Sequence, residues 1–255
     1  MQFHYGIGSA AIALAGLTAI AIPAQAADHT NLEEGLPTEV EDAYPIHYQG
    51  IEFQTEVRFE PLGDGAEALK IEPRLEWGFA PNWQGRVTLP FDVLAEDDEN
   101  ALSAVGLEVF YNFNTEGIHT PAFAVSLGAE IPTAEDSGVE LTLKGIVTKS
   151  IGRGNALDRL HLNVGYTFNT EAHDGERDGR LSAVLGYSRR LSPETMFVSD
   201  IAFEQEEQDD ENSLILEAGL RHQVSPLSVL SMGTGVGLTE DSPDFRLTLG
   251  WQQAL

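Results

Sequence analysis

Charged side chains of both signs recur at alternate positions along much of this chain, and they set the chemistry that the protein can perform. A carboxylate and a guanidinium or ammonium group can leave bulk water only when they are paired or wetted. Two interpretations stay open: a salt-bridge network that fills a narrow interior, or a polar pathway whose charges select a solute. The candidate residues are Arg58, Lys70, Glu72, Arg74, Glu76, Arg86, Asp92, Glu108, Glu130, Lys144, Arg159, His161, Glu217, Arg221 and Arg246.

Catalytic chemistry has weaker support in the sequence. His161 and Asn163 share one row, and Ser182 and Ser188 lie on the same row of the next segment, but a polar lining supplies such neighbours by chance. The chain has no G-x-S-x-G elbow, no P-loop and no H-E-x-x-H motif. It also has no cysteine, which excludes disulfides, zinc-thiolate sites and thiol nucleophiles. We therefore expect no enzyme, no catalytic residue, no metal site and no cofactor.

The charge balance narrows the choice of partners. Fourteen Lys and Arg residues stand against 41 Asp and Glu residues, which gives a net charge of −27 with neutral histidines. Such a chain repels phosphate backbones, so we expect no nucleic-acid partner. The acid-rich loop at 204–211 could collect Ca²⁺ or Mg²⁺ through its oxygen atoms, although it lacks the ordered spacing of a calcium loop.

These side chains must be positioned by strands, because the dominant pattern from Gly50 onward has period two. Ile51, Phe53, Val57 and Phe59, for example, fall on one face of a segment whose other face is polar. Most segments have about 11 to 14 residues, longer than ordinary globular strands and long enough for tilted strands that cross a membrane. The pattern predicts an all-β fold, an antiparallel up-and-down transmembrane β-barrel of about 12 strands. The segments are 51–60, 69–79, 83–93, 102–113, 121–132, 138–151, 158–168, 180–191, 195–205, 212–223, 227–238 and 244–255.

The connections and the aromatic residues support a membrane barrel. Connections after odd-numbered strands are acidic, as in LAEDDEN and EQEEQDDEN, whereas several of the others are tight turns such as Ala80-Pro81-Asn82. An even-stranded barrel places these two sets at opposite ends, with the short turns facing the periplasm. Aromatic residues on the apolar rows gather toward both ends, as interfacial girdles do. Inward-facing glycines, among them Gly186, Gly219 and Gly250, could keep a passage open.

The first 49 residues differ from the rest of the chain. Residues 1–26 carry no charged side chain and end in Ala24-Gln25-Ala26, so they are expected to be a cleaved signal peptide. Residues 27–49 have no clear period and form either a periplasmic lead-in or a luminal segment, although a flexible tail is the commoner outcome for such a stretch. Their carboxylates could pair with inward-facing arginines. Residues 50–255 are expected to be the outer-membrane β-barrel.

Several stretches resemble the meta-pathway phenol-degradation outer-membrane proteins, a transporter-like family of outer-membrane barrels. The stretches are IEPRLEWGFAPNWQGRVTLPF, PAFAVSLGAEIPT, LHLNVGYTF, AVLGYSRRLSPET and GTGVGLTEDSPDFRLTLGW. The resemblance covers most of 50–251 and rests on strand and turn patterns. It implies an outer-membrane barrel that passes small molecules, including aromatic ones, and it carries over no functional residue. The chain ends on Leu255, whereas many such barrels end on a Phe that the outer-membrane assembly machinery reads.

Two functions therefore remain as hypotheses. The first is a passive channel or transporter for small solutes, including aromatic or hydrophobic compounds, in the cell outer membrane. The alternative is a closed structural outer-membrane barrel whose acidic extracellular loops bind cations. Expected partners are outer-membrane lipid and lipopolysaccharide, a small-molecule solute and the outer-membrane assembly machinery. A soluble, secreted acidic β-protein is a third possibility.

Overall fold

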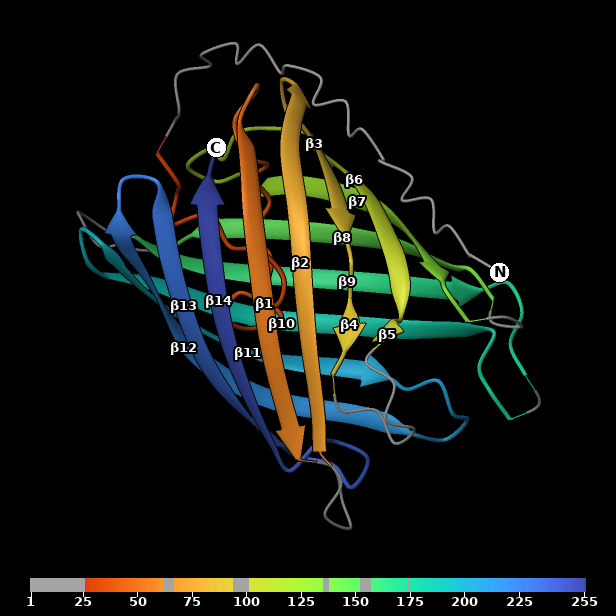
Figure 1. Cartoon of the computed structure of the whole chain (residues 1–255). Helices are drawn as coiled ribbons and strands as arrows, with labels where there is room; N and C mark the ends of the chain where they lie inside the picture. The colour runs from red at the N-terminus through yellow and green to blue at the C-terminus, as the bar shows by residue number, and fades with distance from the viewer. Residues whose placement is uncertain (1–25, 62–66, 94–100, 135–137, 152–156, 174) are drawn as a thin grey trace, which may run out of the picture.

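The computed structural model describes residues 26–61, 67–93, 101–134, 138–151, 157–173 and 175–255 (Figure 1). Every regular element in these ranges is a β-strand. Their bounds are β1 Ile51–Pro61, β2 Glu67–Ala80, β3 Trp83–Thr88, β4 Phe91–Asp92, β5 Ala101–Leu102, β6 Ala104–Asn112, β7 Ala122–Pro132, β8 Glu140–Ser150, β9 Asp158–Asn169, β10 Gly179–Ser192, β11 Thr195–Gln205, β12 Asn212–Ser225, β13 Ser228–Gly237 and β14 Phe245–Ala254.

The strands form a closed antiparallel barrel. Both β3 and β4 pair with β2, so they are two pieces of one barrel strand, interrupted at Leu89 and Pro90. In the same way β5 and β6 are pieces of one strand, so the barrel has 12 strands. The first and last strands close it, in a register that runs from Glu52 opposite Ala254 to Phe59 opposite Leu247. The predicted fold class and strand number are confirmed.

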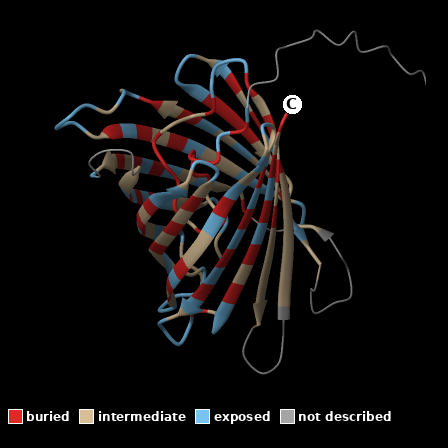
Figure 2. Ribbon diagram, turned by 90° about the vertical axis from the view of Figure 1, so that its left-hand side faces the viewer, coloured by how far each residue is buried: buried red, intermediate tan, exposed pale blue. Residues whose placement is uncertain are grey.

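The strands have two chemically different faces, which Figure 2 shows as alternating colours. In β9, Leu162 and Val164 are exposed on the outside, whereas His161 and Asn163 are buried inside. An apolar exterior of this extent is unfavourable in water and suits lipid. No helix in the described part of the chain is long and apolar enough to cross a membrane.

Aromatic rings cluster at the short-turn end of the barrel. Trp83 packs against Tyr111 and Phe79, with ring centroids 4.4 and 6.0 Å apart, and Tyr111 lies 5.0 Å from Phe113. Such a cluster at one edge of the apolar band is typical of an interfacial girdle. At the opposite end, residues 62–66, 94–100, 135–137 and 174 of the acidic connections lie outside the described residues.

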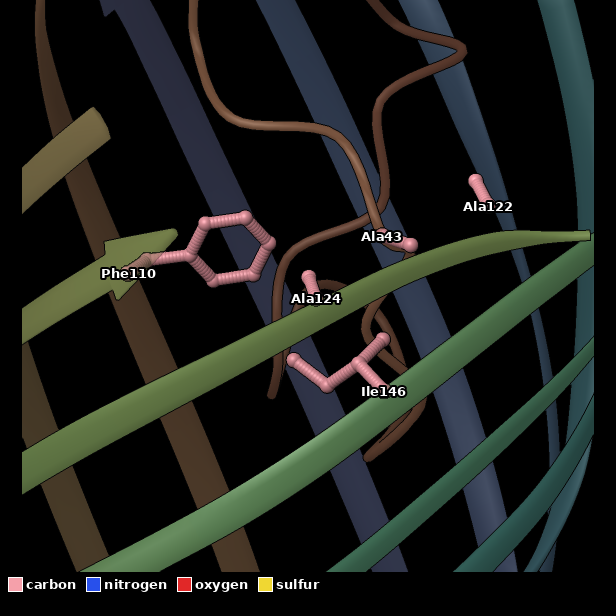
Figure 3. Packing of buried hydrophobic residues seen from close by; sticks show 5 residues of the cluster. All are labelled: Ala43, Phe110, Ala122, Ala124 and Ile146. Atoms are coloured by element: carbon pink, nitrogen blue, oxygen red, sulfur yellow. The ribbon is translucent and has the colours of Figure 1, made fainter. Parts of the chain in front are cut away.

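Residues 27–49, which we call the plug, lie inside the barrel and are not a free tail. In Figure 3 Ala43 of the plug is surrounded by wall strands that carry Phe110, Ala124 and Ile146. These residues and Ala122 form one buried apolar cluster. A second cluster joins Leu32 and Val40 of the plug to the wall. The apolar core of this protein is therefore the contact between plug and wall.

The two-faced arrangement predicts unequal tolerance of charge on the two sides of the wall. Leu127, in the middle of β7, is 61% exposed on the outside, and Thr142 lies inside, one register position away on β8. Leu127→Arg should lower the free energy of folding into a bilayer by about 2–4 kcal/mol, because the guanidinium would face hydrocarbon. The matched Thr142→Arg should cost much less. Urea titrations of refolding into lipid vesicles measure both, and equal losses would contradict the assignment of faces.

Candidate functional site

The plug crosses the lumen and is held by polar side chains of the wall. Its backbone amides donate hydrogen bonds to side chains of five strands. The pairs are Glu39 to Glu217 of β12 (3.2 Å), Val40 to Asp200 of β11 (2.8 Å), Glu41 to Asn163 of β9 (2.9 Å), Ala43 to Thr148 of β8 (2.9 Å) and Ile46 to Gln84 of β3 (2.7 Å). The plug therefore reaches from one side of the barrel to the other.

Wall side chains also donate to the carbonyl oxygens of the plug. Arg221, which is fully buried, donates to His29 (3.2 Å) and to Leu36 (2.6 Å). Arg74 donates to the carbonyl oxygen of Glu34 at 2.6 Å. This part of the plug is not paired with any described barrel strand, so these side chains satisfy backbone groups that burial would otherwise leave unpaired.

Five bases of the wall form ion pairs with carboxylates of the plug. Arg86 contacts Glu33 and Glu41, and Lys144 contacts Glu34 and Glu41, so Glu41 bridges the two bases. The N–O distances are 2.6 Å for Lys144–Glu34 and Lys144–Glu41, 3.0 Å for Arg86–Glu41, 2.6 Å for Arg58–Glu39, 2.8 Å for Arg246–Glu39 and 3.3 Å for Arg159–Asp42.

Most of these bases, and also Arg74 and Lys70, have carboxylate partners on the wall itself. Arg86 contacts Glu76 and, at 2.9 Å, Glu108. The other pairs are Arg58–Glu56 (2.7 Å), Arg74–Glu56 (2.8 Å), Arg74–Glu72 (2.9 Å), Lys70–Glu72 (2.9 Å), Arg246–Glu217 (3.3 Å) and Arg246–Glu60. The charged lining is thus a network of two clusters, one around Arg86 and Lys144 and one around Arg58, Arg74 and Arg246, with Arg159–Asp42 as a separate pair.

The remaining candidates from the sequence have separate surroundings. His161 lies between Thr148 and Ser188, with each ring nitrogen 3.0 Å from a hydroxyl oxygen, and it is buried. A hydroxyl thus occupies the place where a catalytic triad would need a carboxylate. Glu130 lines a cavity and forms no ion pair within the described chain. Asp92 lies opposite Lys70 in the register and is not brought into the network by any ion pair with a described residue.

Two cavities flank the plug. An outer vestibule of about 370 Å³, at the acidic-loop end, is lined by Glu34, Gly35 and Glu39 of the plug and by charged wall residues that include Arg58 and Lys144. An inner cavity of about 660 Å³, at the short-turn end, is lined by Ala26, by plug residues 27–31 and 44–47, and by Arg159. No described residue lines both cavities, so the plug divides the lumen.

Several glycines of the inner row do not keep a passage open, contrary to our interpretation of the sequence, although Gly106 and Gly128 line the outer vestibule. A Cβ atom at Gly186 would collide with Val40 of the plug, and one at Gly233 would collide with Pro37. Gly250 faces Leu36 in the same way. These positions lack a side chain because the plug approaches the wall there, so the glycines make room for the plug.

Sequence reasoning missed some wall residues that hold the plug. Asp200 follows Met196 and Val198, which are apolar and also point inward, so the alternation gives no sign of a charge there. Gln84 and Thr148 are common polar residues with no distinguishing spacing. Pairing of the plug carboxylates with inward-facing arginines is one of the open interpretations of the sequence, because residues 27–49 carry acids and no lysine or arginine, but a flexible tail is the commoner expectation.

Asp42 of the plug makes the attachment of this segment sensitive to pH. It is fully buried, and burial raises its pKa to about 7 even though Arg159 and the backbone amides of Leu32 and Tyr44 oppose the rise. Below pH 4 the carboxyl is protonated in the folded and unfolded states alike. Between pH 4 and 7 only the unfolded chain releases the proton, so stability falls as the pH rises.

We therefore expect Asp42→Asn to remove part of this pH dependence. Between pH 4 and pH 7 the free energy of unfolding of the native chain should fall relative to that of the variant. The difference should be at most on the order of 4 kcal/mol. Urea unfolding midpoints at several pH values measure the difference. Parallel curves for the two chains would show that Asp42 is ionised in the folded state throughout this range.

Comparison with known proteins places this geometry in a family of barrels. The fold matches an outer membrane channel from Pseudomonas putida F1 with a TM-score of 0.67 and 12% identity, over 88% of this chain and 100% of that one. It also matches the NanC porin with a TM-score of 0.58 and 10% identity, over 80% of this chain and 100% of that one. The match to the KdgM porin has a TM-score of 0.54 and 9% identity, over 80% of this chain and 99% of that one. A search of curated proteins found no match. Residues 48–252 match the model of the family described as "Putative MetA-pathway of phenol degradation", and the chain belongs to that family.

Proposed function

We propose that this protein is a passive channel of the outer membrane for small solutes. The observation that carries the proposal is a closed barrel with an apolar exterior and two cavities, one at each end of the lumen, of which the outer one is strongly charged. The likeness of its fold to an outer membrane channel and to two porins supports it. The family description names phenol degradation, and on that basis the proposal includes aromatic or hydrophobic compounds among the solutes.

The charges at the mouth favour cationic and neutral solutes over anions. A mouth cavity of about 420 Å³ shares Glu39, Ala202 and Glu204 with the outer vestibule, so the two are continuous. Carboxylates dominate it, with Arg246 as the only base among the described residues of its lining: Glu39, Glu60, Glu204, Glu206, Glu211, Glu240, Asp241 and Asp244. Lining charge of one sign concentrates solutes of the opposite sign.

One observation favours the alternative, a closed structural barrel with cation-binding loops. The plug leaves no described residue that lines both cavities, and the acidic mouth would attract divalent cations in a barrel that conducts nothing. Lipopolysaccharide phosphates could share such cations with the loops. Solute flux decides between the two functions.

Export and assembly are part of the proposal. Signal-peptide cleavage after Ala26 would leave Ala27 as the first residue. Ala27 is buried beside Val229 and Ala254, and its nitrogen donates to the carbonyl oxygen of Pro226 at 2.9 Å. A small residue at the rim with its amide engaged suits a processed chain end. The apolar exterior would contact lipid, and the assembly machinery would insert the barrel.

Swelling of liposomes that contain the refolded chain tests the channel function. Tyramine and 4-hydroxyphenylacetate share a phenol ring and differ in charge, so they form a matched pair of solutes. We expect faster swelling with tyramine than with 4-hydroxyphenylacetate, because the mouth carries negative charge. Glu204→Gln/Asp241→Asn should reduce this preference, whereas Glu194→Gln, at the opposite end, should leave it unchanged.

Folding is checked first by the heat-dependent gel shift of a closed barrel. A folded barrel that causes no swelling with any solute, including neutral arabinose, would favour the structural alternative. Faster swelling with the anion would contradict the role given to the mouth.

A further inference from the structure

Passage of a solute through this barrel requires the plug to move, an inference that rests on the proposed channel function. The outer vestibule ends at Glu34, Gly35 and Glu39, and the inner cavity begins beyond them at the other end of the lumen. The residues between, 32–41, span the lumen. Val40 lies beside Gly186 of β10 and donates to Asp200 of β11, whereas Glu41 pairs with Arg86 of β3, on the opposite side of the barrel.

The barrel is complete without the plug. Each wall strand pairs with both of its neighbours, and β1 closes on β14. Within the described chain, plug residues 28–46 form no backbone-to-backbone hydrogen bond with a barrel strand. Their amides are held by side chains such as Asp200 and Asn163, which water can replace as partners. Withdrawal of this region therefore breaks no strand ladder.

The charges of the wall are also largely paired without the plug. Arg86 would keep Glu76 and Glu108, and Arg246 would keep Glu60 and Glu217. Lys144 would lose both of its close carboxylates, Glu34 and Glu41. Because an unpaired buried charge is strongly unfavourable, a wall that pairs most of its own bases lowers the free energy of the open state.

Apolar packing holds both ends of the plug and also Leu32 and Val40 in its middle, but the middle has in addition an ion pair that is open to the vestibule. Ala27 is buried in the apolar contact with Val229 and Ala254. At the other end Ala43 packs against Phe110 and Ile146. In the middle, Glu34 is 45% exposed to the outer vestibule while it pairs with Lys144, so an arriving solute or ion meets this contact first.

We propose that residues 32–41 are a gate: they leave Arg86, Lys144, Arg58 and Arg246 so that the two cavities join, while Ala27 and residues 43–50 stay attached to the wall. The gate region carries four carboxylates, Glu33, Glu34, Glu39 and Glu41, and no base. Glu34 and Glu39 line the vestibule together with their partners Lys144 and Arg58, so solvent ions can reach these pairs.

A disulfide that fixes the gate to the wall tests this proposal, and the chain has no native cysteine to interfere. A Cβ at Gly186 would lie 2.8 Å from the Cβ of Val40, so Val40→Cys/Gly186→Cys can form a disulfide after a shift of about 1 Å. Oxidation should reduce liposome swelling to the rate of empty vesicles, and reduction should restore it. The control is Ala27→Cys/Val229→Cys, which fixes an end that the proposal keeps attached and should leave swelling unchanged.

A second variant tests the proposal even if the native chain causes no liposome swelling. Glu34→Gln/Glu39→Gln removes one of the two plug ion pairs of Lys144 and the plug ion pairs of Arg58 and Arg246 without changing side-chain size, and should raise the swelling rate severalfold. Glu171→Gln/Glu194→Gln, which removes the same charge outside the lumen, should not. If the disulfide between positions 40 and 186 fails to form, Pro37→Cys/Gly233→Cys joins the same region to β13.

The outcomes separate the gate from the channel. Equal swelling of the oxidised and reduced gate variants would overturn the gate and leave the channel in place. Swelling only after Glu34→Gln/Glu39→Gln would support both. If no folded variant causes liposome swelling, the channel function is rejected, and the gate is rejected with it.

Discussion

Pairing of carboxylates with bases inside a closed wall is the interaction on which this structure depends. The outer faces of the strands are apolar, so the polar side chains must face a confined interior. An ionised group there is strongly unfavourable unless an opposite charge and hydrogen bonds compensate it. Arg86 illustrates the solution, because its guanidinium contacts Glu33 and Glu41 of the plug and Glu76 and Glu108 of the wall.

The plug completes this network and also determines the packing of the interior. It contributes six carboxylates and no lysine or arginine, and it brings Leu32, Val40 and Ala43 into contact with apolar wall residues. Glycines at 186, 233 and 250 allow the close approach. The same segment thus supplies both the charge balance and the apolar core, and the lumen has a defined shape only with it in place.

The barrel could be predicted from the sequence because each strand carries its own signal. Alternation within β1 or β9 gives the strand, its faces and its approximate bounds, whatever the rest of the chain does. The interruption at Leu89 and Pro90 was not visible, because Phe91 continues the alternation beyond it. The position of the plug could not be derived, because its contacts join residues far apart in sequence, such as Val40 and Asp200. The alternation of residues within a single segment carries no information about contacts between distant segments.

The charged character of the lumen favours transport over a purely structural role. A barrel that only needed filling could use apolar side chains, since replacing buried ion pairs by well-packed hydrophobic groups is often neutral or stabilising. Here Lys144, at the floor of the vestibule, is held by Glu34 of the plug, whose side chain is 45% exposed and within reach of water. Such contacts exchange readily with solvent and ions, whereas an apolar filling would not. The wall pairs most of its own charges, and solvent can replace the contacts that join the plug to it. The lumen can therefore open while the barrel stays folded.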